Sequence, residues 1–149
     1  MLIFIGYIIQ TEFWFSDRGF NNPIVNGTTP PPTTTNIQSN LTQLSITYAP
    51  QLGFSIKNIS IYQLINESDL ILRQTFSGQS QLCSIDKNGH TVYVPVLSST
   101  FNQLFSNYTI VVDDNFLMSK PWNEPLKGIA KGYWIISTGE IGSRMHASM

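Results

Sequence analysis

Three carboxylates in the second half of the chain are candidates for acid–base catalysis. Asp113 and Asp114 are adjacent in "TIVVDDN", and Glu124 follows in "PWNEPL". Two carboxylates act as the acid and base of a glycosidase only when both flank one bond. Consecutive strand residues point to opposite faces, so Asp113 and Asp114 are expected to diverge where "TIVV" ends. Asp also ends strands by bonding nearby backbone amides. We therefore predict a structural connector, with Glu124 in a turn and no catalytic residue.

Calcium binding is the alternative for the same carboxylates. Loop carboxylates and carbonyls at strand ends offer the oxygen ligands that calcium takes. The spacing of Asp113 and Asp114 is not that of an EF-hand loop. A calcium ion near these residues stays an open alternative, and the sequence indicates no other metal and no cofactor.

Cysteine and histidine offer few further candidates for catalysis. Cys83 is the single cysteine, so it can form neither an internal disulfide nor a thiolate cluster. We expect it to be a small buried apolar group, with a reactive thiol or a bridge to another chain as alternatives. His90 follows Asn88-Gly89, which predicts a tight hairpin turn with two positive-φ residues and an exposed histidine. Without a nucleophile–base pair, a hydrolase fragment is the weakest functional hypothesis.

Charge is sparse in this 149-residue chain. Eight basic and nine acidic residues give a net charge of −1 at pH 7. A nucleic-acid binder needs a basic face to displace phosphate counterions, so the composition argues against that class. It argues equally against a polybasic membrane patch. The length fits one domain of ordinary size.

Asparagines in Asn-x-Ser/Thr triplets give a second chemical signal. Chance predicts about two such triplets for this composition, and the chain has five. Abundant Asn, Ser and Thr are the plain alternative, whereas glycosylation would place the protein outside the cell or on its surface. The candidate acceptors are Asn26, Asn40, Asn58, Asn66 and Asn107.

The two ends of the chain differ from its middle. Residues 1–29 hold a short apolar run, Leu2–Ile9, followed by turn formers, and we interpret them as a signal or anchor remnant and a linker. The run is shorter than the roughly 20 residues that span a bilayer, and a β-strand or a misplaced start are alternatives. Residues 140–149, which include His146, are expected to form a flexible tail.

The intervening residues 30–139 show the period-two pattern of β-strands. "LSITY", "NISIYQL" and "NYTIVVD" alternate apolar and polar residues, and "LILRQTF", "LCSI", "TVYVPV" and "GYWIIST" complete the set. About seven short strands without helical periodicity predict an all-β, Ig-like antiparallel sandwich. Tyr108, near the start of a late strand, is in the position of a tyrosine corner, whose hydroxyl bonds upstream backbone.

The order of these motifs resembles the SbsA-type Ig-like domain of bacterial surface-layer and fungal secreted proteins. The resemblance covers about residues 30–139 and includes "IQSNLTQLSITY", "VYVPVLSSTFNQLFSNYTIVVDD" and "NEPLKGIAKGYWIISTG". The chain departs from the family pattern in two places. The segment "QSNLTQLSITYAPQLGFS" lacks the acidic residue that often follows the second strand, and a later loop reads Asn-Glu-Pro in place of Gly-Asn-Pro. The resemblance implies a rigid spacer or adhesion module without catalysis, either monomeric or one unit of a repeat array.

Binding through loop aromatics is the competing function. Trp122 lies in "KPWNEPL", where a tryptophan either packs onto the sandwich or projects to bind a sugar or a protein. Trp134 is expected in the core, and Trp14 lies in the N-terminal segment. A cell-wall glycan or another surface protein is the partner that this hypothesis implies.

Overall fold

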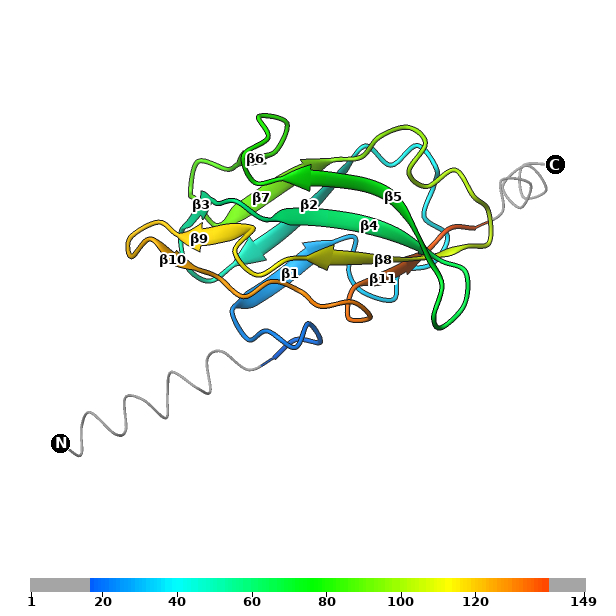
Figure 1. Cartoon of the computed structure of the whole chain (residues 1–149), viewed down its shortest axis with the longest axis horizontal. Helices are drawn as coiled ribbons and strands as arrows, with labels where there is room; N and C mark the ends of the chain where they lie inside the picture. The colour runs from blue at the N-terminus through cyan, green and yellow to red at the C-terminus, as the bar shows by residue number, and fades with distance from the viewer. Residues whose placement is uncertain (1–16, 140–149) are drawn as a thin grey trace.

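The computed structural model describes residues 17–139 as an all-β fold of antiparallel strands, as the sequence predicts (Figure 1). Sheet I has the order β1-β2-β7-β6, sheet II the order β11-β8-β4-β5, and sheet III the order β10-β9-β3. Among the described residues, no helix is long and apolar enough to cross a membrane. The strands are β1 Val25–Thr29, β2 Gln43–Tyr48, β3 Leu52–Phe54, β4 Asn58–Leu64, β5 Leu70–Ser77, β6 Ser84–Ile85, β7 Thr91–Pro95, β8 Asn107–Val112, β9 Leu117–Ser119, β10 Glu124–Pro125 and β11 Ile135–Ser137.

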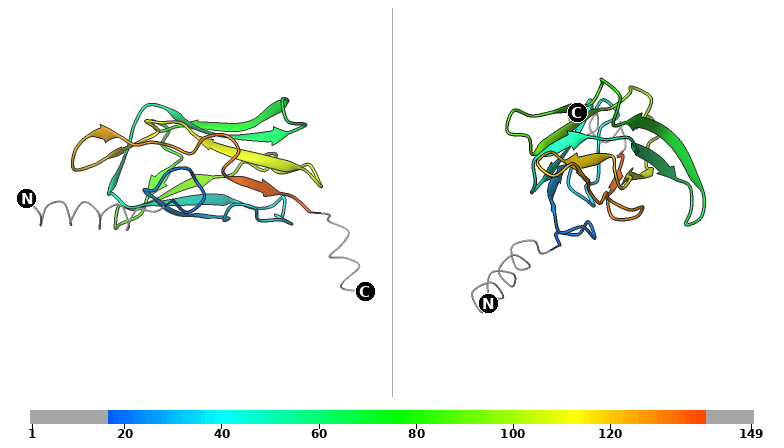
Figure 2. Two further views of the ribbon diagram at one scale, coloured as in Figure 1. Left: turned by 90° about the horizontal axis from the view of Figure 1, so that it is seen from below. Right: turned by 60° about the vertical axis from the view of Figure 1, so that its left-hand side comes forward.

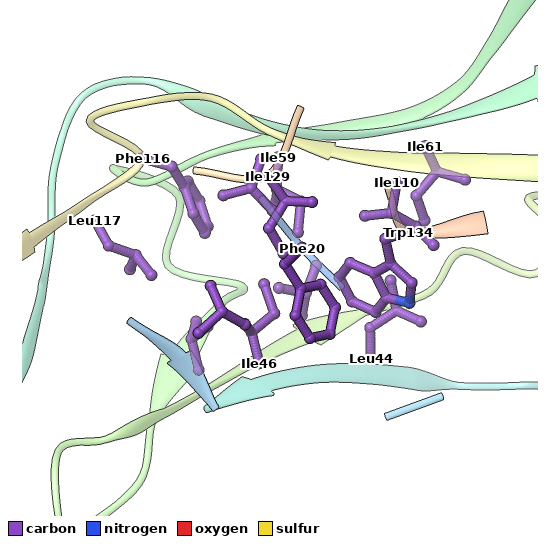
Figure 3. Packing of buried hydrophobic residues seen from close by; sticks show 14 of the residues in the cluster. Phe20, Leu44, Ile46, Ile59, Ile61, Ile110, Phe116, Leu117, Ile129 and Trp134 are labelled. Carbon is purple, nitrogen blue, oxygen red and sulfur yellow. The ribbon is translucent and has the colours of Figure 1, made fainter. Parts of the chain in front are cut away.

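Sheets I and II lie face to face, and sheet III extends one end of the sandwich (Figure 2). The apolar residues of β2, β4 and β8 alternate along each strand and are buried, which places them between the sheets. Strands β4 and β8 also bury one polar residue each, Ser60 and Thr109. Burial of each large apolar side chain stabilises the fold by about 1.5–3 kcal/mol. The core shown in Figure 3 includes Leu44 and Ile46 of β2, Ile59 and Ile61 of β4, Ile110 of β8, and also Phe20, Phe116, Leu117, Ile129 and Trp134.

All seven predicted strands are present, and four more occur in residues 17–139. Strands β1, β3, β9 and β10 were not predicted. Three of them have two or three residues, which is too short for an alternating pattern to show. The fourth, β1, pairs with β2 and lies at an edge of sheet I.

The prediction that the linker extends to residue 29 is wrong. Val25 is buried opposite Tyr48, and Phe20 is also buried in the core. The buried Asn22 side chain donates from Nδ2 to the carbonyl oxygens of Lys127 at 2.7 Å and Gly128 at 2.9 Å. These long-range contacts make residues 17–29 part of the sandwich, whereas "VNGTT" itself carries a single large apolar residue. Residues 1–16, with Trp14, and 140–149, with His146, lie outside the described residues.

The turn between β6 and β7 also differs from the prediction. Only Gly89 of the Asn88-Gly89 pair has a positive φ, at 85°. The Oδ1 atom of Asp86 accepts hydrogen bonds from the backbone N–H groups of Gly89, His90 and Thr91, at 2.9, 3.0 and 3.2 Å. Asp at the first position and Gly at the fourth are typical of a type I turn, so the Asp86 side chain selects a longer loop than the two-residue turn.

Tyr108 makes the contact predicted for a tyrosine corner. Its hydroxyl accepts the Gln103 backbone N–H at 3.3 Å and lies 3.4 Å from the Gln103 carbonyl oxygen. The ring is fully buried and meets Phe101 edge to face, with ring centroids 4.9 Å apart. Burial raises the pKa of Tyr108, so its hydroxyl remains a neutral donor at physiological pH. The contact fixes the loop before β8 against the sandwich.

Candidate functional site

Asp113 and Asp114 connect two different parts of the sandwich. Asp113 Oδ2 accepts the backbone N–H of Asn58, at the start of β4, at 3.2 Å. Asp114 Oδ1 accepts the backbone N–H of Gly128, in the segment before β11, at 2.8 Å. The two carboxylates therefore bond amides of separate segments, as the strand alternation predicts. Each carboxylate therefore links the end of β8 to another segment of the sandwich through a hydrogen bond.

The prediction that Glu124 lies in a turn is wrong, because Glu124 begins strand β10. It is exposed and pairs with Ser119 of β9. Within residues 17–139, no group of three or more His, Cys, Asp and Glu side chains has a geometry that could hold a metal ion. The arrangement of Asp113, Asp114 and Glu124 thus gives no support to a shared acid–base site.

Cys83 and His90 have local structural contacts. Cys83 is buried in the core, and this burial raises the pKa of its thiol to about 11. Since the thiolate is the reactive form, Cys83 is held in its unreactive state near neutral pH. His90 is half-buried, with Nδ1 3.1 Å from the Pro50 carbonyl oxygen, so Nδ1 carries the proton that the bond requires. His90 was predicted to be exposed, and its contact with Pro50 explains the difference.

Trp122 projects from the sandwich. It lies in the turn between β9 and β10, and the residue is 75% exposed to solvent. The turn closes with a hydrogen bond of 2.7 Å from the backbone N–H of Asn123 to the Ser119 carbonyl oxygen. Of the two placements that the sequence left open, packing onto the sandwich and projection into solvent, the structure has the second. Trp134, by contrast, is fully buried, and its Nε1 donates to the Pro30 carbonyl oxygen at 2.9 Å.

A cleft of about 400 Å³, lined by both polar and apolar side chains, lies beside the start of the Trp122 turn. Lys120, two residues before Trp122, lines the cleft, and its backbone N–H donates to the Gln51 carbonyl oxygen at 2.9 Å. The cleft was not predicted, because the β2–β3 connection, the β6–β7 loop and the β9–β10 turn supply it from distant parts of the sequence. The lining residues are Gln51, Leu52, Gly53, Phe54, Ile85, Asp86, Lys87, Asn88, Gly89 and Lys120.

All five candidate glycosylation asparagines are exposed. Asn26 lies on the edge strand β1, Asn40 in the loop before β2, and Asn66 at the tip of the β4–β5 hairpin. Asn58 and Asn107 begin β4 and β8, where the next residue along the chain is buried in each case. Each acceptor side chain is therefore in a position where a glycan would extend into solvent.

Comparison with known proteins identifies no relative of this chain. No protein-family model, no curated protein and no solved structure matches the chain. The resemblance to SbsA-type Ig-like domains therefore stays a prediction that rests on the sequence motifs.

Proposed function

We propose that this chain is a non-catalytic extracellular module of the SbsA-type Ig-like class, with a structural or adhesive role at the cell surface. The observation that carries the proposal is the exposure of all five Asn-x-Ser/Thr acceptors on a rigid β-sandwich. Folded proteins carry such glycans on their surface, where the attached sugars meet no packed side chain. The buried Tyr108 and its bonds to Gln103 support the Ig-like character, since the tyrosine corner is a feature of that fold.

The non-catalytic part of the proposal is supported by what the acidic residues do. Asp113 and Asp114 bond backbone amides of different segments, and Asp86 holds its own turn. An acid–base pair has to converge on one reacting group, which these contacts do not favour. We accordingly expect no turnover of glycosides or esters by the purified chain.

Glycopeptide mapping of the secreted chain tests the proposal. The chain is produced in a glycosylating eukaryotic host, digested, and each acceptor peptide is weighed before and after treatment with an N-glycosidase. We expect sugar on most of Asn26, Asn40, Asn58, Asn66 and Asn107. A chain that leaves the cell with all five acceptors unmodified contradicts the proposal.

Recognition of a carbohydrate through Trp122 is the second candidate function. It is favoured by one observation, the exposed Trp122, which lies two residues along the chain from Lys120, and Lys120 lines a cleft together with Gln51 and Asn88. Flat apolar sugar faces pack on aromatic rings, while amide and ammonium groups bond hydroxyls. The corresponding partner is a cell-wall glycan.

Trp122→Ala is the variant that tests this candidate on a glycan array. Loss of binding with an unchanged melting temperature supports carbohydrate recognition. Tyr133→Ala is the matched control, because Tyr133 is an exposed aromatic residue in a different segment, just before β11. Equal binding by the wild type and both variants rejects the role of Trp122.

A further inference from the structure

The outer face of sheet II carries rows of apolar side chains. Residues paired across antiparallel strands share a face and lie about 5 Å apart between Cβ atoms. Tyr62 of β4 pairs with Leu72 of β5, and Leu64 pairs with Leu70. These side chains point outward, because Ile59 and Ile61 of the same strand β4 point into the core. Leu72 is 52% exposed.

This face lacks the charges that usually keep sheets apart. The residues paired with the apolar rows on this side of the strands are Ser60, Thr75, Val111, Thr109, Ile135, Asn107 and Ser137, and none of them is charged. Ser60 and Thr109 are buried, and the Gly132 backbone N–H donates to Thr109 Oγ1 at 3.1 Å, so the exposed apolar part of the face lies toward β5, where Leu72 is. Strand β5 is also the edge of sheet II. Proteins commonly protect an edge strand or an apolar sheet face with charges or with a covering segment. The one charged residue of β5, Arg73, directs its guanidinium to the Ser99 and Thr100 carbonyl oxygens, away from the apolar rows. The apolar rows next to this edge are therefore open to another form of cover.

Glycan acceptors lie on the same face and at its rim. Asn107 is directly opposite Leu64, in the row that continues to Leu70. Asn58 occupies the other end of β4, also pointing outward, and pairs with Ser77. Asn66 lies at the hairpin tip beyond both leucines, next to the half-exposed Ile65. Three of the five acceptors thus surround one sheet face.

The side chain of Asn107 is oriented for glycan attachment. Its Oδ1 accepts a hydrogen bond from the Ser137 hydroxyl, which fixes the carboxamide. The glycan is attached through Nδ2, the atom that this bond leaves available. The Asn58 backbone N–H bonds Asp113. Both acceptors are therefore held at defined positions of the sheet.

We propose that the glycans at Asn58 and Asn107 cover the apolar outer face of sheet II and keep copies of the chain from associating through it. The occupant of the face is the chain's own sugar: the C–H faces of the pyranose rings pack on Tyr62 and the leucines, while their hydroxyls face water. The glycan at Asn66 closes the rim at the hairpin tip. This inference rests on the proposed glycosylation.

Two double variants of the full secreted chain test the inference. Asn58→Gln with Asn107→Gln removes the sugars from this face. Asn26→Gln with Asn40→Gln removes the same number of sugars away from sheet II, on β1 and in the loop before β2. Glutamine is preferable to enzymatic removal, because an N-glycosidase leaves an aspartate and so adds charge. The measurements are elution volume in size-exclusion chromatography and fluorescence of a dye that responds to apolar surfaces.

We expect the first double variant to elute as larger species, with a severalfold rise in dye fluorescence. The control double variant should match the wild type in both elution volume and fluorescence. Adding Leu70→Thr and Leu72→Thr to the first variant should restore the elution of the wild type. The inference is overturned if both double variants behave alike, or if the leucine substitutions restore nothing. Wild-type chain with sugars at the other acceptors but none at Asn58 and Asn107 overturns this inference alone. Wild-type chain with no sugar at any acceptor overturns the proposed function as well.

Discussion

The β4–β5 and β9–β10 hairpins both expose large apolar side chains, and they differ in what surrounds those side chains. The first exposes Ile65 and Leu72 between candidate glycosylation asparagines at its tip and on its face. The second exposes Trp122, and residues 117–125 contain no Asn-x-Ser/Thr triplet. Under the proposed glycosylation, sugars would cover the apolar surface of the first hairpin, whereas Trp122 in the second would stay accessible to a ligand.

The two hairpins are also attached differently to the sandwich (Figure 1). Strand β4 pairs over six residues with β8 and over seven with β5, so the first hairpin is continuous with the core sheet. The second rests on the two- and three-residue pairings of sheet III. The segment that follows β10, residues 126–129, is called the return segment. It is joined to the end of β8 by the Val112–Ile129 bridge and the Asp114–Gly128 hydrogen bond. Stability of the second region therefore depends on a few close contacts.

Gly128→Ala is expected to have the largest effect on stability. A Cβ atom at this position would lie 1.8 Å from the Val112 carbonyl oxygen and 2.7 Å from the Asp113 carbonyl carbon. The backbone of the return segment would have to move, which breaks its bonds to Val112 and Asp114. We expect a loss of about 4 kcal/mol or more in the free energy of unfolding, measured by urea denaturation.

Gly27→Ala is the matched control for that prediction. A Cβ at Gly27 would meet no atom within 4 Å, and the change keeps the Asn26 triplet intact. Its expected effect on the free energy of unfolding is below about 1 kcal/mol. Equal stability of the two glycine variants would show that the return segment does not hold the second hairpin in this way.

Tyr108→Phe is expected to have an intermediate effect on stability. Tyr108 lies in β8, where it pairs with Gln63 of β4, the first strand of the β4–β5 hairpin. The substitution removes the hydroxyl contacts to Gln103 while keeping the buried ring, at a cost of about 1 kcal/mol. Tyr133→Phe is the control, because Tyr133 is 42% exposed, and its expected effect is within about 0.5 kcal/mol. Thermal denaturation of both variants measures the difference. The same loss in both would mean that the tyrosine corner contributes nothing specific.

Trp122→Ala is expected to have the smallest effect on stability. An indole that projects into solvent buries little surface, so the free energy of unfolding should change by about 0.5 kcal/mol or less. A tryptophan packed onto the sandwich would cost about 3–5 kcal/mol when truncated. Chemical denaturation of the variant distinguishes these values. A loss of several kcal/mol would remove the contrast between a covered and an accessible hairpin.

The sequence predicts the long strands well and the contacts between them poorly. Strand β4 has the bounds of "NISIYQL", because its alternation matches one buried and one outer face. Strand β1 and the cleft depend on pairing and proximity between segments distant in sequence. The turn at Asp86 was assigned wrongly because a side-chain contact, and not the Asn-Gly pair, determines its length. Exposure of Trp122 was left open for the same reason, since local sequence does not say what a loop residue packs against.

The proposal that the chain is a glycosylated extracellular module is tested by intact-mass spectrometry of the chain from its native culture medium, before and after treatment with an N-glycosidase. The proposed extracellular role predicts a heterogeneous mass above that of the polypeptide, which collapses on treatment. Each released site then leaves an aspartate and a mass about 1 Da above that of asparagine. A chain whose mass is that of the bare polypeptide and is unchanged by the enzyme contradicts the claim.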